Sequence, residues 1–308
     1  MPSMKAIKRR RLTVKNISQI TKAMNLVATS KLQRARANKT AIGLPVQATF
    51  DIVYNTVKDE SALAQPFVAP REIKNTAYVL VTSNRGLCGG YNSNVCKALL
   101  AHAKQNNSNA VIVPVGTKGR DYFKRRNKNL IEVPPPSETP NFSESKFVAE
   151  KLISMYEAGE IDEVFLVYTQ FFTVLALEPI VRKVLPLDPE YLRKVVGADL
   201  KNDEKWEDLG FFKKPEQKPA SAMVQDVEFD SGIENVLRSV IPWYLSMFLY
   251  AATASAALCE HAARMTSMDS ATKNAGDIIE KLTLQFNRQR QSIITQEITE
   301  IISGAESL

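Results

Sequence analysis

The chain has 308 residues and a mass of 34.3 kDa, a length that suits one large domain or two ordinary ones. Hydrophobic residues make up 44% and charged residues 24% of it, so the composition excludes the disordered, collagen-like and disulfide-rich classes. The formal net charge is +7, and it is unevenly distributed. The first 50 residues contain eleven Lys or Arg and no Asp or Glu, which indicates an acidic partner: nucleic acid, anionic lipid or an acidic protein surface.

A long helix is the first predicted element and covers residues 1–60. Its apolar residues recur in steps of three, four or seven, as in a helix that keeps one stripe against a partner helix. Gly43 and Pro45 are the first residues that disfavour a helix, and a bend is expected there. The stripe consists of Val14, Ile17, Met24, Val27 or Ala28, Leu32, Ala35, Ile42, Val46, Phe50, Val53 and Val57.

The pattern changes over residues 61–225, where short β-branched or aromatic runs alternate with helical segments. This alternation predicts an α/β domain with a central doubly wound, mainly parallel sheet. Residues 199–219 of this domain are charged and rich in turn formers, and we expect a surface loop there. Strands are expected over residues 75–82, 110–115, 129–133 and 163–170, an edge strand within 173–187, and helices near 94–106 and 143–158.

A second long helix is predicted over residues 226–308, again with apolar steps of three, four or seven. We expect it to pair with the first helix as an antiparallel coiled coil, with Ile293, Ile298 and Ile301 continuing its stripe. Residues 239–259 contain no charged side chain, a run long enough to cross a bilayer. Pro242, several Ser and Thr residues and the helical spacing favour a buried protein helix instead, so no membrane span is expected.

The residues needed for catalysis or metal binding are scarce. Cys88, Cys96 and Cys259 form no Cys-x-x-Cys pair, and the only histidines are His102 and His261. We therefore expect buried free thiols, histidines at helix surfaces or interfaces, and neither a metal site nor a catalytic residue in this chain.

One glycine-rich stretch, residues 83–92 (SNRGLCGGYN), follows the first expected strand, where nucleotide-binding folds place a phosphate loop. Its glycine spacing does not match Gly-x-Gly-x-x-Gly, so a tight structural turn is expected and no cofactor. Residues 116–120 are expected to form a similar turn with basic residues.

The basic N-terminal helix leaves three interpretations open on composition and periodicity alone. It is able to contact nucleic-acid phosphates, to lie against an acidic protein surface, or to present a solvated face. A basic coiled-coil nucleic-acid-binding protein is therefore one hypothesis, and a nucleotide-binding enzyme built on the α/β domain is another.

Three stretches closely resemble the gamma subunit of F-type ATP synthases of the bacterial type. The first runs from Ile7 (IKRR) through residues 14–28 (VKNISQITKAMNLVA), and the second is residues 83–92. The third comprises residues 260–265 (EHAARM), 271–276 (ATKNAG) and 294–305 (ITQEITEIISGA). They occur at both ends and in the middle of the chain, so the resemblance covers the whole architecture.

This resemblance implies a central rotor shaft that couples ion-driven rotation of a membrane ring to conformational changes in an alpha/beta hexamer. Its implied partners are three alpha and three beta subunits, the epsilon subunit and the membrane c-ring, with one copy per complex and no nucleic acid. It implies a peripheral position on the cytoplasmic face of the cell membrane. The catalytic residues of the family lie on beta, so the subunit itself is not an enzyme.

The resemblance also assigns partner-binding residues. Met24 matches a shaft residue that faces the acidic catch loop of beta, and Arg264 and the pair Arg290 and Gln291 match positions at the same catch. Thr295 and Glu297 fall in the segment that runs through the ring.

Overall fold

A computed structural model of the chain describes residues 3–57, 62, 64–106, 108–190, 192 and 233–306. Both long predicted helices are present: α1 spans Met4–Val57 and α7 spans Ile233–Glu306. The chain divides into two compact units, one of residues 1–30 with 264–308 and one of residues 31–263. The expected domain boundaries near 60 and 225 and the charged segment 199–219 lie outside the described residues, so that division of the chain stays a prediction.

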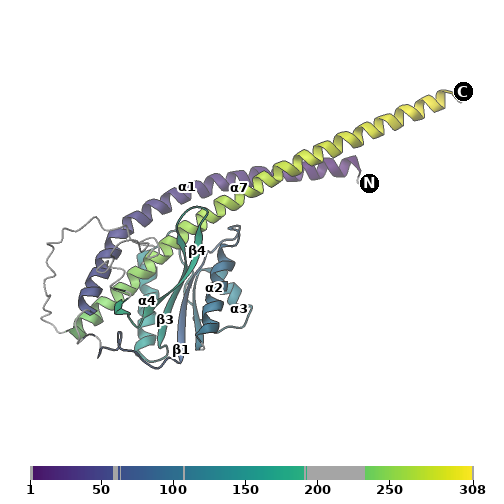
Figure 1. The fold of residues 1–308 in the computed structure, drawn as a ribbon. Helices are drawn as coiled ribbons and strands as arrows, with labels where there is room; N and C mark the ends of the chain where they lie inside the picture. Colours follow the sequence, from purple (N-terminus) through teal and green to yellow (C-terminus); the bar gives the residue numbers. More distant parts are fainter. Residues whose placement is uncertain are drawn as a thin grey trace. The chain divides into compact units, whose positions relative to one another are not determined.

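In the first unit the two terminal helices run antiparallel. The Arg11 guanidinium lies 5.2 Å from the centre of the Phe286 ring. Further along, the hydroxyls of Thr21 and Thr272 are 2.8 Å apart, and the Asn25 amide donates to the Met265 carbonyl at 2.9 Å. Residue numbers rise along α1 as they fall along α7, which confirms the predicted antiparallel pair (Figure 1).

The buried residues of this unit include small or polar side chains and large apolar ones in equal number: Thr21, Ala28 and Ala275, and Ile7, Met268 and Leu282. Ala28 is 2% exposed while Val27 is 55% exposed, which decides between the two candidates for that position. Ile17 was expected in the seam and is 48% exposed, so this prediction was wrong. Thr21, one turn further along α1, is 9% exposed and contacts Thr272 across the seam instead.

The second unit contains a four-stranded sheet in the order β2-β1-β3-β4. Strand β1 (Asn75–Val81) pairs in parallel with both β2 (Asn109–Val115) and β3 (Glu163–Phe171), while β4 (Leu177–Leu185) is an antiparallel edge strand on β3. This arrangement confirms the mainly parallel sheet with a further strand at one edge.

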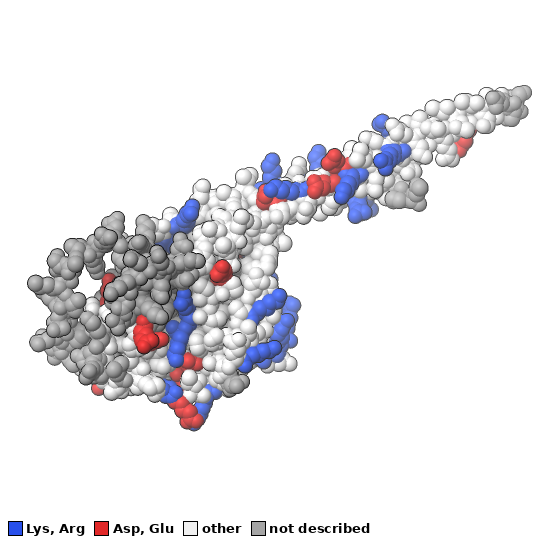
Figure 2. All heavy atoms as spheres, in the orientation of Figure 1, with Lys and Arg blue, Asp and Glu red and all other residues white. Residues whose placement is uncertain are grey.

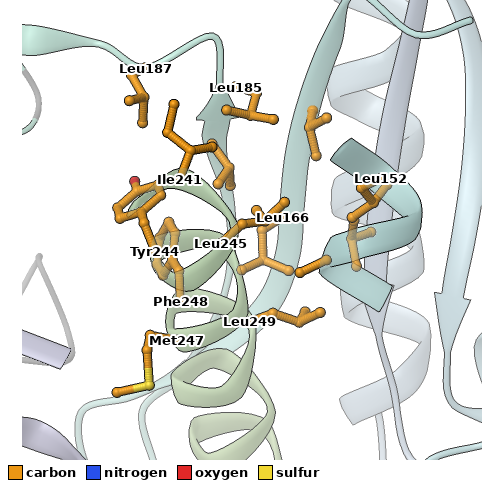
Figure 3. Packing of buried hydrophobic residues seen from close by; sticks show 14 of the residues in the cluster. Leu152, Leu166, Leu185, Leu187, Ile241, Tyr244, Leu245, Met247, Phe248 and Leu249 are labelled. Carbon is orange, nitrogen blue, oxygen red and sulfur yellow. The ribbon is translucent and has the colours of Figure 1, made fainter. Parts of the chain in front are cut away.

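Helices cover both faces of the sheet, which confirms the doubly wound prediction. Tyr78 and Leu80 of β1 share a buried cluster with α2 (Tyr91–Gln105) and α3 (Thr117–Lys124). The alternate residues Ala77 and Val79 face a larger cluster with α4 (Phe142–Glu157), α1 and α7. Figure 3 shows side chains of α7 directed at strand residues such as Leu166. The β period of two therefore places alternate strand residues in two separate cores.

The uncharged stretch 239–259 belongs to this larger core. Ile241, Phe248 and Ala252 are completely buried, and the Phe50 ring packs edge-on against Tyr244 and Phe248 with centroids 5.1 and 5.4 Å apart. By length and composition α7 is the one described helix able to cross a membrane, yet 67% of its most apolar window is buried inside the protein. Its hydrophobicity is that of a core helix.

Two local expectations differ from the structure. Residues 129–133 form no strand beyond an isolated bridge between Ile112 and Leu130, because the prolines at 134–136 lack the N–H donors that would extend it. Residues 116–120 were expected to be a turn, but α3 begins at Thr117, directly after Gly116. This helix is held by a close approach: the Gly119 N–H donates to Thr82 Oγ1 at 2.9 Å. A Cβ at position 119 would lie 2.7 Å from that oxygen.

Candidate partner-binding surface

Met24 and Arg264 lie at the same level of the paired helices in the first unit. Each is half-buried and directly precedes a residue of the Asn25–Met265 hydrogen bond that joins α1 to α7. The structure therefore brings together two of the six residues assigned by resemblance, one from each helix.

The other four assigned residues lie much further along α7. Arg290, Gln291, Thr295 and Glu297 are all exposed. Twenty-six residues separate Arg264 from Arg290, which corresponds to about 39 Å along a helix axis. The six assigned residues therefore lie in two separate groups along the paired helices.

Beyond Arg290 the surface of α7 changes character. Arg11 lies opposite Phe286, so the antiparallel register leaves residues after about 293 without an α1 residue beside them. Ile298 and Ile301 were expected in the seam and are 52% and 70% exposed. Ile294 and Ile302 are also exposed, and no Lys or Arg follows Arg290. The unequal lengths of the two predicted helices indicate that one extends past the other, and the register at Arg11 and Phe286 shows which end of α7 does so.

The basic residues of α1 do not form one uniform face. Lys5, Lys8, Lys15 and Lys22 are exposed in the first unit, and Figure 2 shows blue and red patches beside one another along the paired helices. In the second unit Lys31 forms an ion pair with Glu138. Lys39 lies 5.8 Å from the centre of the Phe171 ring, and burial lowers the pKa of its ammonium while the nearby Cys259 thiol opposes this shift.

The glycine-rich stretch after β1 is a structural turn. Asn92 Oδ1 accepts a hydrogen bond from the Ser83 N–H at 3.0 Å, and Asn92 Nδ2 donates to Ser83 Oγ at 2.8 Å. Leu87 and Gly89 have positive φ angles of 62° and 57°, a conformation typical of tight turns. The side chains of Ser83 and Asn92 thus hold the turn.

The described titratable residues do not form a catalytic arrangement. His102 Nδ1 lies 3.0 Å from the Tyr78 hydroxyl, and burial lowers the pKa of this histidine while Glu163 opposes the shift. His261 is buried rather than at a helix surface. Cys88, Cys96 and Cys259 are buried and form no disulfide bond, as expected, and burial raises the pKa of Cys96 and of Cys259 to about 12. Such thiols are poor nucleophiles. The described residues include no cluster of three or more His, Cys, Asp or Glu able to hold a metal ion.

The chain is similar to known proteins along its whole length. A family model described as ATP synthase matches residues 3–308. The chain is 35% identical over 309 residues to the ATP synthase gamma chain of Moorella thermoacetica, with 100% of both chains covered.

Solved structures share the fold. A chain of the Euglena gracilis mitochondrial ATP synthase (OSCP/F1/c-ring) is similar with a TM-score of 0.62 and 18% identity, covering 99% of this chain and 94% of that one. A chain of the Tetrahymena thermophila mitochondrial ATP synthase (central stalk and c-ring) has a TM-score of 0.53 and 21% identity, covering 82% and 99%.

The fold and the surface together define a class of non-catalytic subunits. In this class the two long terminal helices pair with each other, and the α/β region lies between them in the amino-acid sequence. Apolar side chains on the paired helices stay exposed in the isolated chain. This chain belongs to the gamma chain family of ATP synthases.

Proposed function

We propose that this chain is the central rotor shaft of a membrane ATP synthase. It couples ion-driven rotation of the membrane ring to conformational changes at the catalytic sites of an alpha/beta hexamer, and it is not itself catalytic. The observation that carries the proposal is the C-terminal part of α7, which extends beyond the start of α1. Ile298 and Ile301 are exposed in this part of the helix. A soluble protein rarely leaves such a surface open unless another protein covers it.

The shaft works through differential contact. A rotating surface alters a nucleotide site only if it interacts more favourably with one conformation of that site than with another. The two groups of residues on the paired helices, Met24 with Arg264 and Arg290 with Gln291, provide unequal surfaces at two levels of the shaft. Thr295 and Glu297 extend the second group into the segment proposed to run through the ring.

The basic surface of α1 fits an acidic protein loop better than a nucleic acid. Its lysines at 5, 8, 15 and 22 are exposed, and acidic patches lie beside basic ones along the paired helices (Figure 2). Exposed ion pairs with an acidic loop would each stabilise a contact by about 1 kcal/mol or less. Membership of the ATP synthase family favours the shaft over the nucleic-acid alternative.

The finer composition of the complex is part of the proposal. One copy of the chain would assemble with three alpha and three beta subunits, and its α/β unit would contact the epsilon subunit and the membrane c-ring. The complex would lie on the cytoplasmic face of the cell membrane, with this chain peripheral and without a membrane span of its own.

Reconstitution tests the proposal. Purified alpha and beta subunits are mixed with and without the chain, and the rate of ATP hydrolysis is measured against ATP concentration. We expect the chain alone to be inactive and the mixture to show cooperative turnover only when the chain is present. Equal cooperative hydrolysis without the chain would contradict the proposed role.

A further inference from the structure

Positive charge is concentrated in one stretch of the second unit. Residues 91–130 contain eight Lys or Arg and a single acidic residue, Asp121. Outside this stretch the chain has 32 basic and 32 acidic residues, so the formal net charge of +7 equals the charge of these 40 residues. A charge distribution as uneven as this one indicates an anionic partner.

The stretch folds into α2, β2 and α3, and its two helices lie on the same face of the sheet. Phe123 of α3 shares a buried cluster with Val95 and Leu99 of α2. Burial raises the pKa of the Cys96 thiol on α2, and the nearby Arg126 guanidinium opposes this rise, so the basic residues after α3 lie close to α2. Both helices bury their apolar sides, which leaves their charged sides facing outward.

Seven of the eight basic side chains are exposed on this face. The eighth, Arg120, is half-buried and lies 3.4 Å from the Asp121 carboxylate, which balances its charge. Within the described parts of the chain, no acidic side chain lies within ion-pair distance of the other seven. Figure 2 shows blue side chains gathered over α2 and α3 with no red among them. The seven residues form the basic patch: Lys97, Lys104, Lys118, Lys124, Arg125, Arg126 and Lys128.

The basic patch lacks the apolar centre of a stable protein interface. The centre of such an interface is apolar and depleted of Lys, whereas none of the exposed large apolar side chains of the described residues lies within 91–130. Stacking of a nucleic-acid base needs an exposed ring. Tyr91 and Phe123 are buried, and the Arg126 guanidinium covers one face of half-buried Tyr122 at 3.7 Å from the ring centre. The basic patch therefore suits a diffuse anionic surface that attracts it by charge alone.

We propose that the basic patch binds the anionic headgroups of a lipid membrane. Clusters of about four to eight Lys or Arg are typical of protein surfaces that bind anionic lipids. The inference rests on the proposed function only in taking the membrane as the anionic surface beside the chain. No large apolar side chain enters the bilayer, so the contact is reversible. An attraction without fixed partners also allows lipids to move past the unit while the chain turns.

Co-flotation of the full chain with vesicles tests the proposal. The chain is mixed at about 50 mM salt with vesicles of phosphatidylcholine that contain about 30% phosphatidylglycerol, or with vesicles of phosphatidylcholine alone. We expect saturable binding to the anionic vesicles and at least about tenfold weaker binding to the neutral ones. Raising the salt to about 500 mM should release the chain, because salt screens exposed charges.

Two double variants with the same loss of charge locate the surface. Lys124→Gln with Lys128→Gln removes two charges from the basic patch and should weaken binding to the anionic vesicles about tenfold. Lys8→Gln with Lys15→Gln removes two exposed charges from α1 in the first unit. This control should weaken binding by less than about twofold, because acidic side chains lie beside the basic ones along the paired helices (Figure 2). Far-UV circular dichroism establishes that both variants are folded.

Three results would overturn the proposal. The first is equal binding to the neutral and the anionic vesicles. The second is equal weakening by the two double variants, which would mean that only the net charge of the chain matters. The third is displacement of the chain from the vesicles by a short DNA duplex at an equal concentration of phosphate groups, which would assign the basic patch to nucleic acid. None of these results bears on the shaft role, which reconstitution with alpha and beta subunits tests separately.

Discussion

The hydroxyls of Thr21 and Thr272 meet across the seam of the paired helices at 2.8 Å. Each hydroxyl also lies near a carbonyl of its own helix, Thr21 near Ser18 at 3.1 Å and Thr272 near Met268 at 2.8 Å. A hydroxyl has one proton and two lone pairs. Thr272 therefore donates to the Met268 carbonyl and accepts from the Thr21 hydroxyl. Thr21 is thus the donor and Thr272 the acceptor of the hydrogen bond that joins α1 to α7.

Thr272→Val should weaken the helical pair. The substitution keeps the branched shape and removes the acceptor of Thr21, so we expect a loss of about 1 kcal/mol in the free energy of unfolding. Urea denaturation followed by circular dichroism measures it. Thr13→Val, which removes an exposed hydroxyl that bonds only within its own helix, should change stability by less than about 0.5 kcal/mol. Equal effects of the two changes would show that the seam bond contributes nothing.

Coupling should depend on the two groups of shaft residues. Arg264→Ala and Gln291→Ala are each expected to lower the amount of ion pumping per ATP hydrolysed severalfold in the assembled enzyme, while the fold of the chain is kept. Lys281→Ala, an exposed basic position on the same helix, serves as the control and should pump normally. Wild-type ion pumping and ATP synthesis in both Arg264→Ala and Gln291→Ala would reject this assignment.

The exposed end of α7 should matter for assembly and not for folding. The double variant Ile298→Lys and Ile301→Lys places charge on side chains that the isolated chain leaves in solvent, so its unfolding should shift by less than about 0.5 kcal/mol. Burial of those side chains in a partner would make the same charges costly. We expect a severalfold higher concentration of alpha and beta subunits for half-maximal reconstitution. An unchanged reconstitution curve would mean that this surface stays uncovered.

Replacing glycine by alanine should destabilise the protein at one position and stabilise it at another. Gly116 has φ +127°, and a Cβ there would lie 2.2 Å from the Thr82 carbonyl oxygen, so Gly116→Ala should cost about 3 kcal/mol or more. Gly276 lies inside α7 with open space around it. Gly276→Ala should therefore stabilise the chain by about 0.5–1 kcal/mol through helix propensity. Thermal unfolding compares the two, and a stabilising Gly116→Ala would contradict the geometry.

Stability of the second unit should fall in mild acid through His102. Burial lowers the pKa of His102 below its ordinary value of 6.5, so the unfolded chain binds more protons than the folded chain as pH drops below that value. The urea concentration at which half of the protein is unfolded should decrease when the pH is lowered from 7.5 to 5.5. His102→Gln should reduce this fall, whereas Lys104→Gln, an exposed change on the same helix, should not. An identical pH dependence in His102→Gln would exclude this histidine as the cause.

The sequence predicted the elements whose residues repeat regularly. Spacings of three, four and seven predicted α1 and α7 and their pairing, and β-branched runs predicted β1, β2 and β3 close to their observed bounds. It misassigned positions decided by tertiary geometry. Ile17 is exposed because Thr21, and not Ile17, faces α7, and the first turn of α3 packs Gly119 against Thr82. Both contacts join residues that are far apart in the chain, so the spacing of neighbouring residues does not predict them.

The candidate surface was predictable only in part. Motif resemblance selected Met24, Arg264, Arg290, Gln291, Thr295 and Glu297, and it did not indicate that they divide into two groups about 39 Å apart on a helix. The unaccompanied apolar end of α7 follows from the unequal helix lengths, yet Ile298 and Ile301 match the seam pattern equally well. Only the register observed at Arg11 and Phe286 distinguishes a seam residue from one that needs a partner.

Direct observation of rotation tests the central claim. Asn94, which is exposed on α2, is replaced by cysteine and labelled. The native thiols are buried, so the label attaches at position 94. The alpha/beta hexamer of the assembled complex is then fixed to a surface. During ATP hydrolysis we expect the label to turn in one direction with three equal pauses per revolution. A label that stays still relative to the hexamer while hydrolysis proceeds at the full cooperative rate would contradict the account.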